Sequence, residues 1–408
     1  MNSQTYITIR ENIMNALPKN TVTFLFSGKG VRKSADAQYP FQANRNFYYA
    51  TGIQEPEAVV VFDKTTQDVT LFLREIDPNM EKWVGHYMTE EEAQLISGIE
   101  DIRYFDEFDA FVNSVMERDV QIGLDFDHDT ITEEFHGSGL AFVDFVSEDR
   151  VVNIFEELVR LRMVKLPEEV EAIKHALVVT NDAIMGALEE VKPGNNENDV
   201  AARFYYEGMK QHGDLMFDTI LAGGKNATVL HYIENNQELL DGDLVLFDLG
   251  IRVNGYGGDI SRTFPINGKF TDRQRDVYQV VLDTFHAVNE AIRPGISIKT
   301  LNDLAKEYLA EGCIQLGLIE DPQDVSRYYY HGIGHSLGLD THDVWIDREE
   351  PLQAGNVITN EPGLYIAEEG IGIRIETDVL VTEESNEDLA PQIIREVSDI
   401  EAYFESKQ

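Results

Sequence analysis

Two aspartates on a predicted β-hairpin have the types and spacing that could do chemistry. The segment 243–264 reads DLVLFDLGIRVNGYGGDISRTF, and Asn254-Gly255 is typical of a two-residue turn between two extended runs. In this register the numbers of opposed residues sum to 509, so Asp259 would face Gly250, two positions from Asp248. Side chains alternate between faces, so both aspartates are expected on one face as diagonal neighbours, unless a bulge at the nearby glycine pair breaks the register.

Two neighbouring carboxylates on an apolar hairpin repel each other and lose hydration. Buried like charges of this kind share either a proton or a metal ion. The alternative is that both aspartates lie in solvated loops, and a motif this short leaves the two interpretations open. Other polar groups in the chain are needed to decide.

A glycine-rich segment later in the chain concentrates histidines. Residues 331–343 read HGIGHSLGLDTHD and hold three of the ten histidines in the chain, namely His331, His335 and His342. The glycines allow the backbone to fold tightly and to present the imidazoles to a shared cavity. A single histidine there would more often be packed or solvated, but three in one loop favour chemistry.

Two more segments contribute acidic and basic groups. Glu361 follows a predicted strand at 356–359. Over residues 372–380, apolar side chains alternate with charged ones that include Arg374 and Glu376, so one face of a predicted strand is charged. That face is either a solvated edge or the wall of a cavity, and the sequence leaves both open.

Two aspartates, two glutamates and one histidine together form a hard, oxygen-rich ligand set. Bridging carboxylates allow such a set to hold two divalent ions about 3.5–4 Å apart. One imidazole among four carboxylates favours Mn²⁺, with Co²⁺, Zn²⁺ and Fe²⁺ as competitors. A centre of this kind lowers the pKa of a shared water and polarises a carbonyl, which predicts hydrolysis.

The composition restricts the possible partners and location. The 408-residue chain carries 33 Lys and Arg against 74 Asp and Glu, a formal charge of −41, which argues against nucleic acid or an anionic membrane surface as a partner. We expect no membrane span and no signal peptide, because the sequence has no run of eighteen apolar residues and no apolar core near its start. The single cysteine, Cys313, excludes an intrachain disulfide and favours a cytoplasmic location.

The length of the chain predicts two domains. Short strands and helices alternate over residues 1–150, which predicts a small mixed α/β domain. Residues 151–165 are expected to form a connecting helix, and residues 166–408 a second domain.

The second domain contains an internal repeat. Two Pro-Gly helix ends, Pro193-Gly194 and Pro294-Gly295, lie 101 positions apart. Each follows a long amphipathic helix and precedes another, so we expect duplicated halves with an active site between them. A chance similarity of two helix ends is the alternative.

With these groups in view, the chain resembles the pita-bread metallopeptidases, and within them the aminopeptidase P family. The motifs DLG, DISRTF, HGIGHSLGLDTHD, EPG and IRIETD occur in the family's order along nearly the whole chain. Residues 34–52, SADAQYPFQANRNFYYATG, look like the amino-terminal domain of that family. The resemblance implies an α/β (α+β) chain with a small mixed α/β N-terminal domain and a C-terminal pita-bread domain of duplicated helix-and-strand halves.

The resemblance also implies the metal ligands. Asp248 would bind one of two divalent ions, and Asp259 and Glu376 would bridge both. His335 and Glu361 would complete the second site. A hydroxide that bridges the two ions would attack the scissile carbonyl, and Glu361 would orient it and take its proton.

Four further residues would act on the substrate by the same resemblance. His231, in the run LHY, would contact the substrate. His342 would hydrogen-bond the scissile carbonyl or its oxyanion. His331 and Arg374 would lie further out and take part in substrate contact and proton movement.

The activity implied by the resemblance is hydrolysis of the peptide bond between an N-terminal residue and a penultimate proline. Proline-containing peptides would be the substrates, and the chain would form a homo-oligomer, a dimer or a tetramer. One alternative is a prolidase restricted to Xaa-Pro dipeptides. A metal-independent or non-catalytic relative of the same fold is a weaker alternative, because the chain retains all five ligands. Residues 215–218 and Asn360 depart from the family pattern, which bears on pocket shape and removes no ligand.

Overall fold

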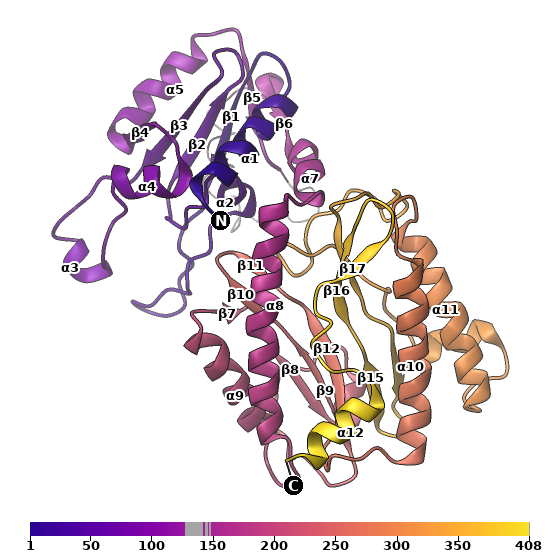
Figure 1. Cartoon of the computed structure of the whole chain (residues 1–408). Helices are drawn as coiled ribbons and strands as arrows, with labels where there is room; N and C mark the ends of the chain where they lie inside the picture. The colour runs from indigo at the N-terminus through magenta and orange to yellow at the C-terminus, as the bar shows by residue number, and fades with distance from the viewer. Residues whose placement is uncertain (127–141, 143–145, 147, 408) are drawn as a thin grey trace. The chain divides into compact units, whose positions relative to one another are not determined.

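The chain folds into two compact units, residues 1–162 and 163–408, coloured along the sequence in Figure 1. The computed structural model describes residues 1–126, 142, 146 and 148–407. The predicted domain 1–150 therefore lies partly outside the described residues. The division between the units falls inside the predicted connecting segment 151–165.

Unit 1 contains a six-stranded mixed sheet in the order β4-β3-β2-β1-β5-β6. The pairs β1–β5, β3–β4 and β5–β6 are parallel, and β1–β2 and β2–β3 are antiparallel. The strands are β1 (Thr21–Phe26), β2 (Val59–Asp63), β3 (Asp68–Leu73), β4 (Asp101–Tyr104), β5 (Gln121–Leu124) and β6 (Val151–Asn153). The helices are α1 (Ser3–Ala16), α2 (Arg45–Thr51), α3 (Glu81–Val84), α4 (Glu90–Ser97) and α5 (Phe108–Met116).

The predicted connecting helix begins later than expected. Val151–Asn153 forms strand β6, and only Phe155–Met163 forms the helix, α7. Val151 pairs with Ile122 of β5, because two β-branched residues in succession suit a strand that extends the sheet.

Unit 2 contains the two helix pairs that the repeat predicts. In Figure 1 several of its strands lie between α8, of the first pair, and α10, of the second. The four helices are α8 (Pro167–Ala187), α9 (Glu197–Lys210), α10 (Asp272–Ala291) and α11 (Ile298–Gln315). The shorter helix α12 (Val397–Glu405) ends the described chain. No helix in the described residues has both the length and the apolarity to span a membrane.

The two halves of unit 2 repeat the same local structure. Gly194 and Gly295 have φ values of 89° and 90°, a conformation that favours glycine. The N–H of Gly194 donates to the Leu239 carbonyl and that of Gly295 to the Leu352 carbonyl, each at 2.9 Å. A new helix begins three residues after each glycine. The predicted duplication is confirmed.

Short sheets occupy the middle of unit 2 and include the predicted hairpin. They have the orders β12-β9-β8, β11-β10-β7, β13-β16-β17 and β14-β15. The first half supplies β7 (Asp214–Leu215), β8 (Ile220–Gly223), β9 (Leu244–Leu249), β10 (Ile251–Val253), β11 (Tyr256–Gly257) and β12 (Ile260–Pro265). The second half supplies β13 (Val357–Asn360), β14 (Gly363–Ile366), β15 (Ile371–Arg374), β16 (Thr377–Val381) and β17 (Asn386–Asp388).

The hairpin has the predicted turn and register. Asn254 and Gly255 have φ values of 51° and 88°, as a type I′ turn requires. Every pair of opposed residues in β10–β11 and β9–β12 has numbers that sum to 509. Strand pairing is interrupted around Gly250, where an added Cβ would lie 1.9 Å from the Gly258 carbonyl oxygen. The register continues across this interruption, so the bulge does not occur.

Candidate metal centre

A cavity of about 740 Å³ in unit 2 brings together all nine predicted site residues. Both halves of the repeat contribute to its lining. The first half supplies His231, Asp248 and Asp259, and the second half supplies His331, His335, His342, Glu361, Arg374 and Glu376. The charged face of 372–380 is therefore the wall of a cavity, and the interpretation as a solvated edge is wrong.

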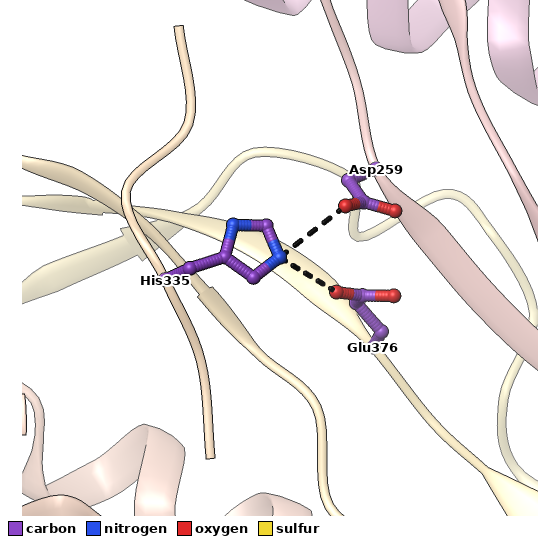
Figure 2. A group of neighbouring side chains, drawn as sticks. All are labelled: Asp259, His335 and Glu376. Carbon is purple, nitrogen blue, oxygen red and sulfur yellow. Dashed lines mark ion pairs between the residues drawn. The ribbon is translucent and has the colours of Figure 1, made fainter. Parts of the chain in front are cut away.

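Three of these residues place ligand atoms close enough to share one ion. Asp259, His335 and Glu376 each offer an atom within 4.8 Å of the others (Figure 2). His335 Nε2 lies 3.4 Å from Asp259 Oδ2 and 4.0 Å from Glu376 Oε1. Glu361 Oε1 is 3.6 Å from the same nitrogen. Asp259 Oδ1 is buried without a hydrogen-bond partner among the described residues, which fits a carboxylate that binds a cation.

Backbone contacts fix the tautomer and position of His335. Its Nδ1 lies 3.0 Å from the Ser336 carbonyl oxygen, which accepts only, so Nδ1 carries the proton. The Nε2 lone pair is left to face the carboxylates, as in metal-binding histidines. The His335 N–H donates to Thr359 Oγ1 at 3.1 Å, and the Thr359 N–H donates to the His335 carbonyl at 2.9 Å. These two hydrogen bonds attach the loop that carries His335 to strand β13.

Arg374 links Asp248 to the rest of the centre. Its Nη2 donates to Asp248 Oδ2 at 2.6 Å, and its Nη1 donates to the Tyr365 hydroxyl at 2.9 Å. Its Nε donates to Ser261 Oγ at 2.7 Å, and Ser261 Oγ donates to Glu376 Oε2 at 2.7 Å. Ser261 and Tyr365 were not among the predicted site residues. Ser261 lies two positions after Asp259, so the period-two alternation places it on the same face.

Asp378 is a further residue that the sequence did not single out. The predicted strand 372–380 is broken, because β15 ends at Arg374 and β16 begins at Thr377. Asp378 is fully buried, and its Oδ2 accepts the Asp259 N–H at 3.0 Å. It thereby holds the backbone of Asp259 at the point where cross-strand pairing in the hairpin is interrupted.

Burial and mutual repulsion raise the pKa values of the ligand carboxyls. For Asp259, burial is the main cause and Asp248 the second. For Glu376, burial comes first and Asp259 second. Burial and then Glu376 raise the pKa of Glu361 to about 8. A cluster of carboxylates that resists ionisation in this way is stabilised by divalent cations, so the residues present fit the implied metal ions.

The two flanking histidines are neutral at pH 7. Burial, and then Arg374, lower the pKa of His331 to about 4. Its Nδ1 donates to the Gly332 carbonyl at 2.7 Å, so its Nε2 accepts from the Tyr365 hydroxyl at 2.7 Å. Partial burial, and then His335, lower the pKa of His342 to about 4, and the rings of these two histidines lie 4.2 Å apart.

We expect Gly334→Ala to displace the loop that carries His335. A Cβ at this position would lie 2.1 Å from the backbone oxygen of Thr359, so the hydrogen bonds between loop and β13 must break. Thermal unfolding should show a loss of about 2–4 kcal/mol, and bound metal should fall with it. Gly332→Ala is the matched control, because its Cβ meets only the guanidinium of the exposed Arg348 side chain, at 3.2 Å. Equal stability of the two variants would contradict this account.

Comparison with known proteins agrees with this fold and site. Residues 171–383 match the model of metallopeptidase family M24, and residues 6–122 match that of the aminopeptidase P N-terminal domain. The chain is 33% identical to the Xaa-Pro aminopeptidase of Escherichia coli K12, over 96% of each chain. A solved structure from Bacillus anthracis, described as a candidate aminopeptidase P, superposes with a TM-score of 0.95 at 43% identity, over 100% of this chain and 99% of that one. A zinc-substituted E. coli aminopeptidase P with bound product gives 0.90 at 31% identity, over 100% and 99%.

The duplicated halves, with a carboxylate and imidazole cluster between them, define a pita-bread metallohydrolase fold. The chain belongs to metallopeptidase family M24.

Proposed function

We propose that this chain is a metal-dependent Xaa-Pro aminopeptidase, which releases the N-terminal residue from peptides with proline in second position. The observation that carries the proposal is the single cavity that holds five candidate metal ligands together with three histidines and an arginine. Similarity over the whole chain to a protein named Xaa-Pro aminopeptidase supports it.

The five candidate ligands would hold two divalent ions. They are Asp248, Asp259, His335, Glu361 and Glu376. When bound, the ions lower the pKa of a shared water and polarise the scissile carbonyl. Mn²⁺ is the ion we propose, because a single imidazole among four carboxylates is a hard, oxygen-rich set.

The residues around this set divide the remaining tasks. Glu361, as an ionised carboxylate, would act as the general base that takes a proton from the attacking water. His342, neutral at pH 7, donates an N–H to the scissile carbonyl and to the oxyanion that develops there. His231 contacts the substrate at the exposed side of the cavity.

A chain of hydrogen bonds begins at His331, which lies beside Glu361. His331 Nδ1 lies 3.7 Å from Glu361 Oε2, and His331 Nε2 accepts from the Tyr365 hydroxyl. Tyr365 in turn accepts from Arg374, which donates to Asp248. These contacts support a role for His331 and Arg374 in proton movement.

Apolar residues in the cavity suit the proline ring. Leu230, Ile298 and Trp345 line it together with the polar groups. Peptide bonds that precede proline lack an N–H, so recognition of the ring depends on such contacts and not on a backbone donor.

A cytoplasmic location and a homo-oligomer of two or four subunits complete the proposal. Cys313, the single cysteine, is buried, and burial raises the pKa of its thiol to about 11, which suits an inert thiol in a reducing compartment. The subunit number follows from the family resemblance, and light scattering of the purified protein measures it.

We expect chelation to abolish cleavage and Mn²⁺ to restore it. The substrates are matched Xaa-Pro and Xaa-Pro-Xaa peptides, with Xaa-Ala-Xaa as the control, and the released first residue is quantified. Loss of the ions should lower kcat/KM at least about a hundredfold, because they supply both the nucleophile and carbonyl polarisation. Cleavage of dipeptides alone would identify a prolidase. Undiminished activity without metal would identify a metal-independent enzyme.

A further inference from the structure

A buried glutamate lies behind the segment that carries His231. Glu197 is the first residue of α9 and is fully buried. Its Oε1 accepts from the Gly223 N–H at 2.7 Å and from Asn226 Nδ2 at 3.2 Å. Its Oε2 accepts from the Tyr232 hydroxyl at 2.8 Å and from the Gln237 N–H at 2.9 Å. One carboxylate therefore accepts hydrogen bonds from both ends and from the middle of the segment 224–237. We call this segment the His231 loop.

The bond to Tyr232 connects this glutamate to His231. Tyr232 is buried in a small apolar cluster that includes Leu246 and Tyr365. Burial, and then the hydrogen bond to Glu197, raise the pKa of Tyr232 to about 12, so its hydroxyl remains a donor. His231, one position earlier, is exposed and lines the cavity. Tyr232 anchors the backbone of the His231 loop on its buried side, while the imidazole of His231 lines the cavity.

A comparison of the two halves of the repeat shows that only the first half has a glutamate at this position. The position 101 residues later, also the first residue of a helix, is Ile298. A buried carboxylate is therefore not needed to start this helix in the pita-bread repeat. All four partners of Glu197 belong to the His231 loop or to the residue directly before it.

We propose that Glu197 is a positioning residue for His231. Its side chain accepts from four donors and thereby fixes the His231 loop, which holds the imidazole in the cavity where the substrate would bind. The kinetic consequence rests on the proposed peptidase function, whereas the geometric consequence for His231 does not.

A double-mutant cycle tests the coupling between the two residues. Glu197→Gln keeps the size of the side chain but replaces one acceptor oxygen by an amide NH₂, which then faces a donor. We expect it to lower kcat/KM about tenfold in the parent but less than about twofold in the His231→Ala background, as for two groups that act as a unit. Tyr232→Phe, which removes only one hydroxyl, should show the same dependence on His231. Equal losses in both backgrounds would overturn the proposal.

Glu169→Gln is the matched control for replacing a buried glutamate by glutamine. Glu169 also lies in the first turn of a long helix, is 1% exposed and accepts from a tyrosine, Tyr256, at 2.7 Å. Tyr256 is outside the His231 loop. Whatever this variant costs in kcat/KM, the cost should be the same with and without His231.

A measurement of the His231 ring separates this inference from the proposed function. In protein with labelled histidines, the Cε1–H signal of His231 is assigned by its absence from His231→Ala. We expect Glu197→Gln and Tyr232→Phe to shift or broaden that signal and Glu169→Gln to leave it in place. An unmoved signal in both loop variants would overturn the positioning role. If the parent cleaves none of the proline peptides, the proposed function fails while this signal still decides the role of Glu197.

Discussion

Replacing Asp259 by asparagine should remove metal and activity but leave the fold intact. The asparagine amide cannot bridge two cations as a carboxylate does, so the variant should lose at least one of the proposed ions. We expect kcat/KM to fall on the order of a thousandfold, as when one member of a group that acts together is removed. Metal analysis of the purified variant, together with the peptide assay, measures both effects.

The fold should survive because asparagine removes the free-energy cost of burying an acidic group among other carboxyls without a cation. Asp259 is 4% exposed, and its carboxyl lies near those of Asp248 and Glu361. Removing one of three repelling carboxylates stabilises the metal-free protein, so its melting temperature should equal or exceed that of the chelated parent.

Asp125→Asn is the control for the loss of a buried carboxylate elsewhere. Asp125 belongs to unit 1, accepts from Asn46 Nδ2 at 3.0 Å and does not line the cavity. It should keep its metal and its activity. Full metal occupancy and normal turnover in Asp259→Asn would remove Asp259 from the site.

Local sequence signals were sufficient for the hairpin and the helix pairs. The Asn254-Gly255 turn set the register, and this register placed Asp248 and Asp259 in one cavity. The two Pro-Gly ends predicted where α9 and α11 begin. These features depend on backbone preferences within a few residues, which a single sequence contains.

Features that depend on contacts between residues far apart in the chain could not be predicted from the sequence, because they leave no local pattern. The strand 372–380 breaks at Glu376 because its backbone N–H donates to the Ser261 carbonyl at 3.0 Å, a partner 115 positions away. Lys165 and Asp343, 178 positions apart, form an ion pair with both side chains 1% exposed, and no local pattern in the sequence pairs the two residues. Alternation indicated that a charged face exists, but only the packing of the two halves showed that it is buried.

The two departures from the family pattern, at residues 215–218 and at Asn360, differ in whether they reach the cavity. Asp218 and the neighbouring Phe217 line the cavity, so the difference at 215–218 reaches the substrate space. Asn360 is fully buried and donates to the Phe285 carbonyl at 3.0 Å, behind the cavity wall. We therefore interpret the first departure as relevant to substrate preference and the second as relevant to packing.

Raising the pH from 6.5 to 8 should destabilise the metal-free protein. In the folded state Glu361 has a pKa of about 8, and burial raises the pKa values of Asp259 and Glu376 as well. The unfolded chain ionises such groups near pH 4, so across this window the folded state holds protons that the unfolded state lacks. Stability then falls as pH rises, by about 1.4 kcal/mol per pH unit for each such proton.

The histidines oppose this trend near the lower end of the window. The lowered pKa values of His331 and His342, about 4, mean that the unfolded state binds more protons between pH 4 and 6.5. Their contribution to stability therefore increases through pH 6.5, the ordinary pKa of histidine, and levels off about one pH unit above it. From there to pH 8 the raised pKa values of the carboxyls set the slope.

Bound metal should reverse the trend, because the cations require ionised ligands and bind more tightly as pH rises. The measurement is the urea concentration at which unit 2 is half unfolded. Unfolding is monitored by the fluorescence of Trp345, which lines the cavity. Replacing the other tryptophan, Trp83, which is 85% exposed, by phenylalanine isolates that signal. In the chelated protein, Glu361→Gln should reduce the fall of the unfolding free energy with pH by about 1.4 kcal/mol per pH unit, the effect of one proton. A chelated midpoint that stays constant or rises from pH 6.5 to 8 would show that these carboxyls are already ionised without metal.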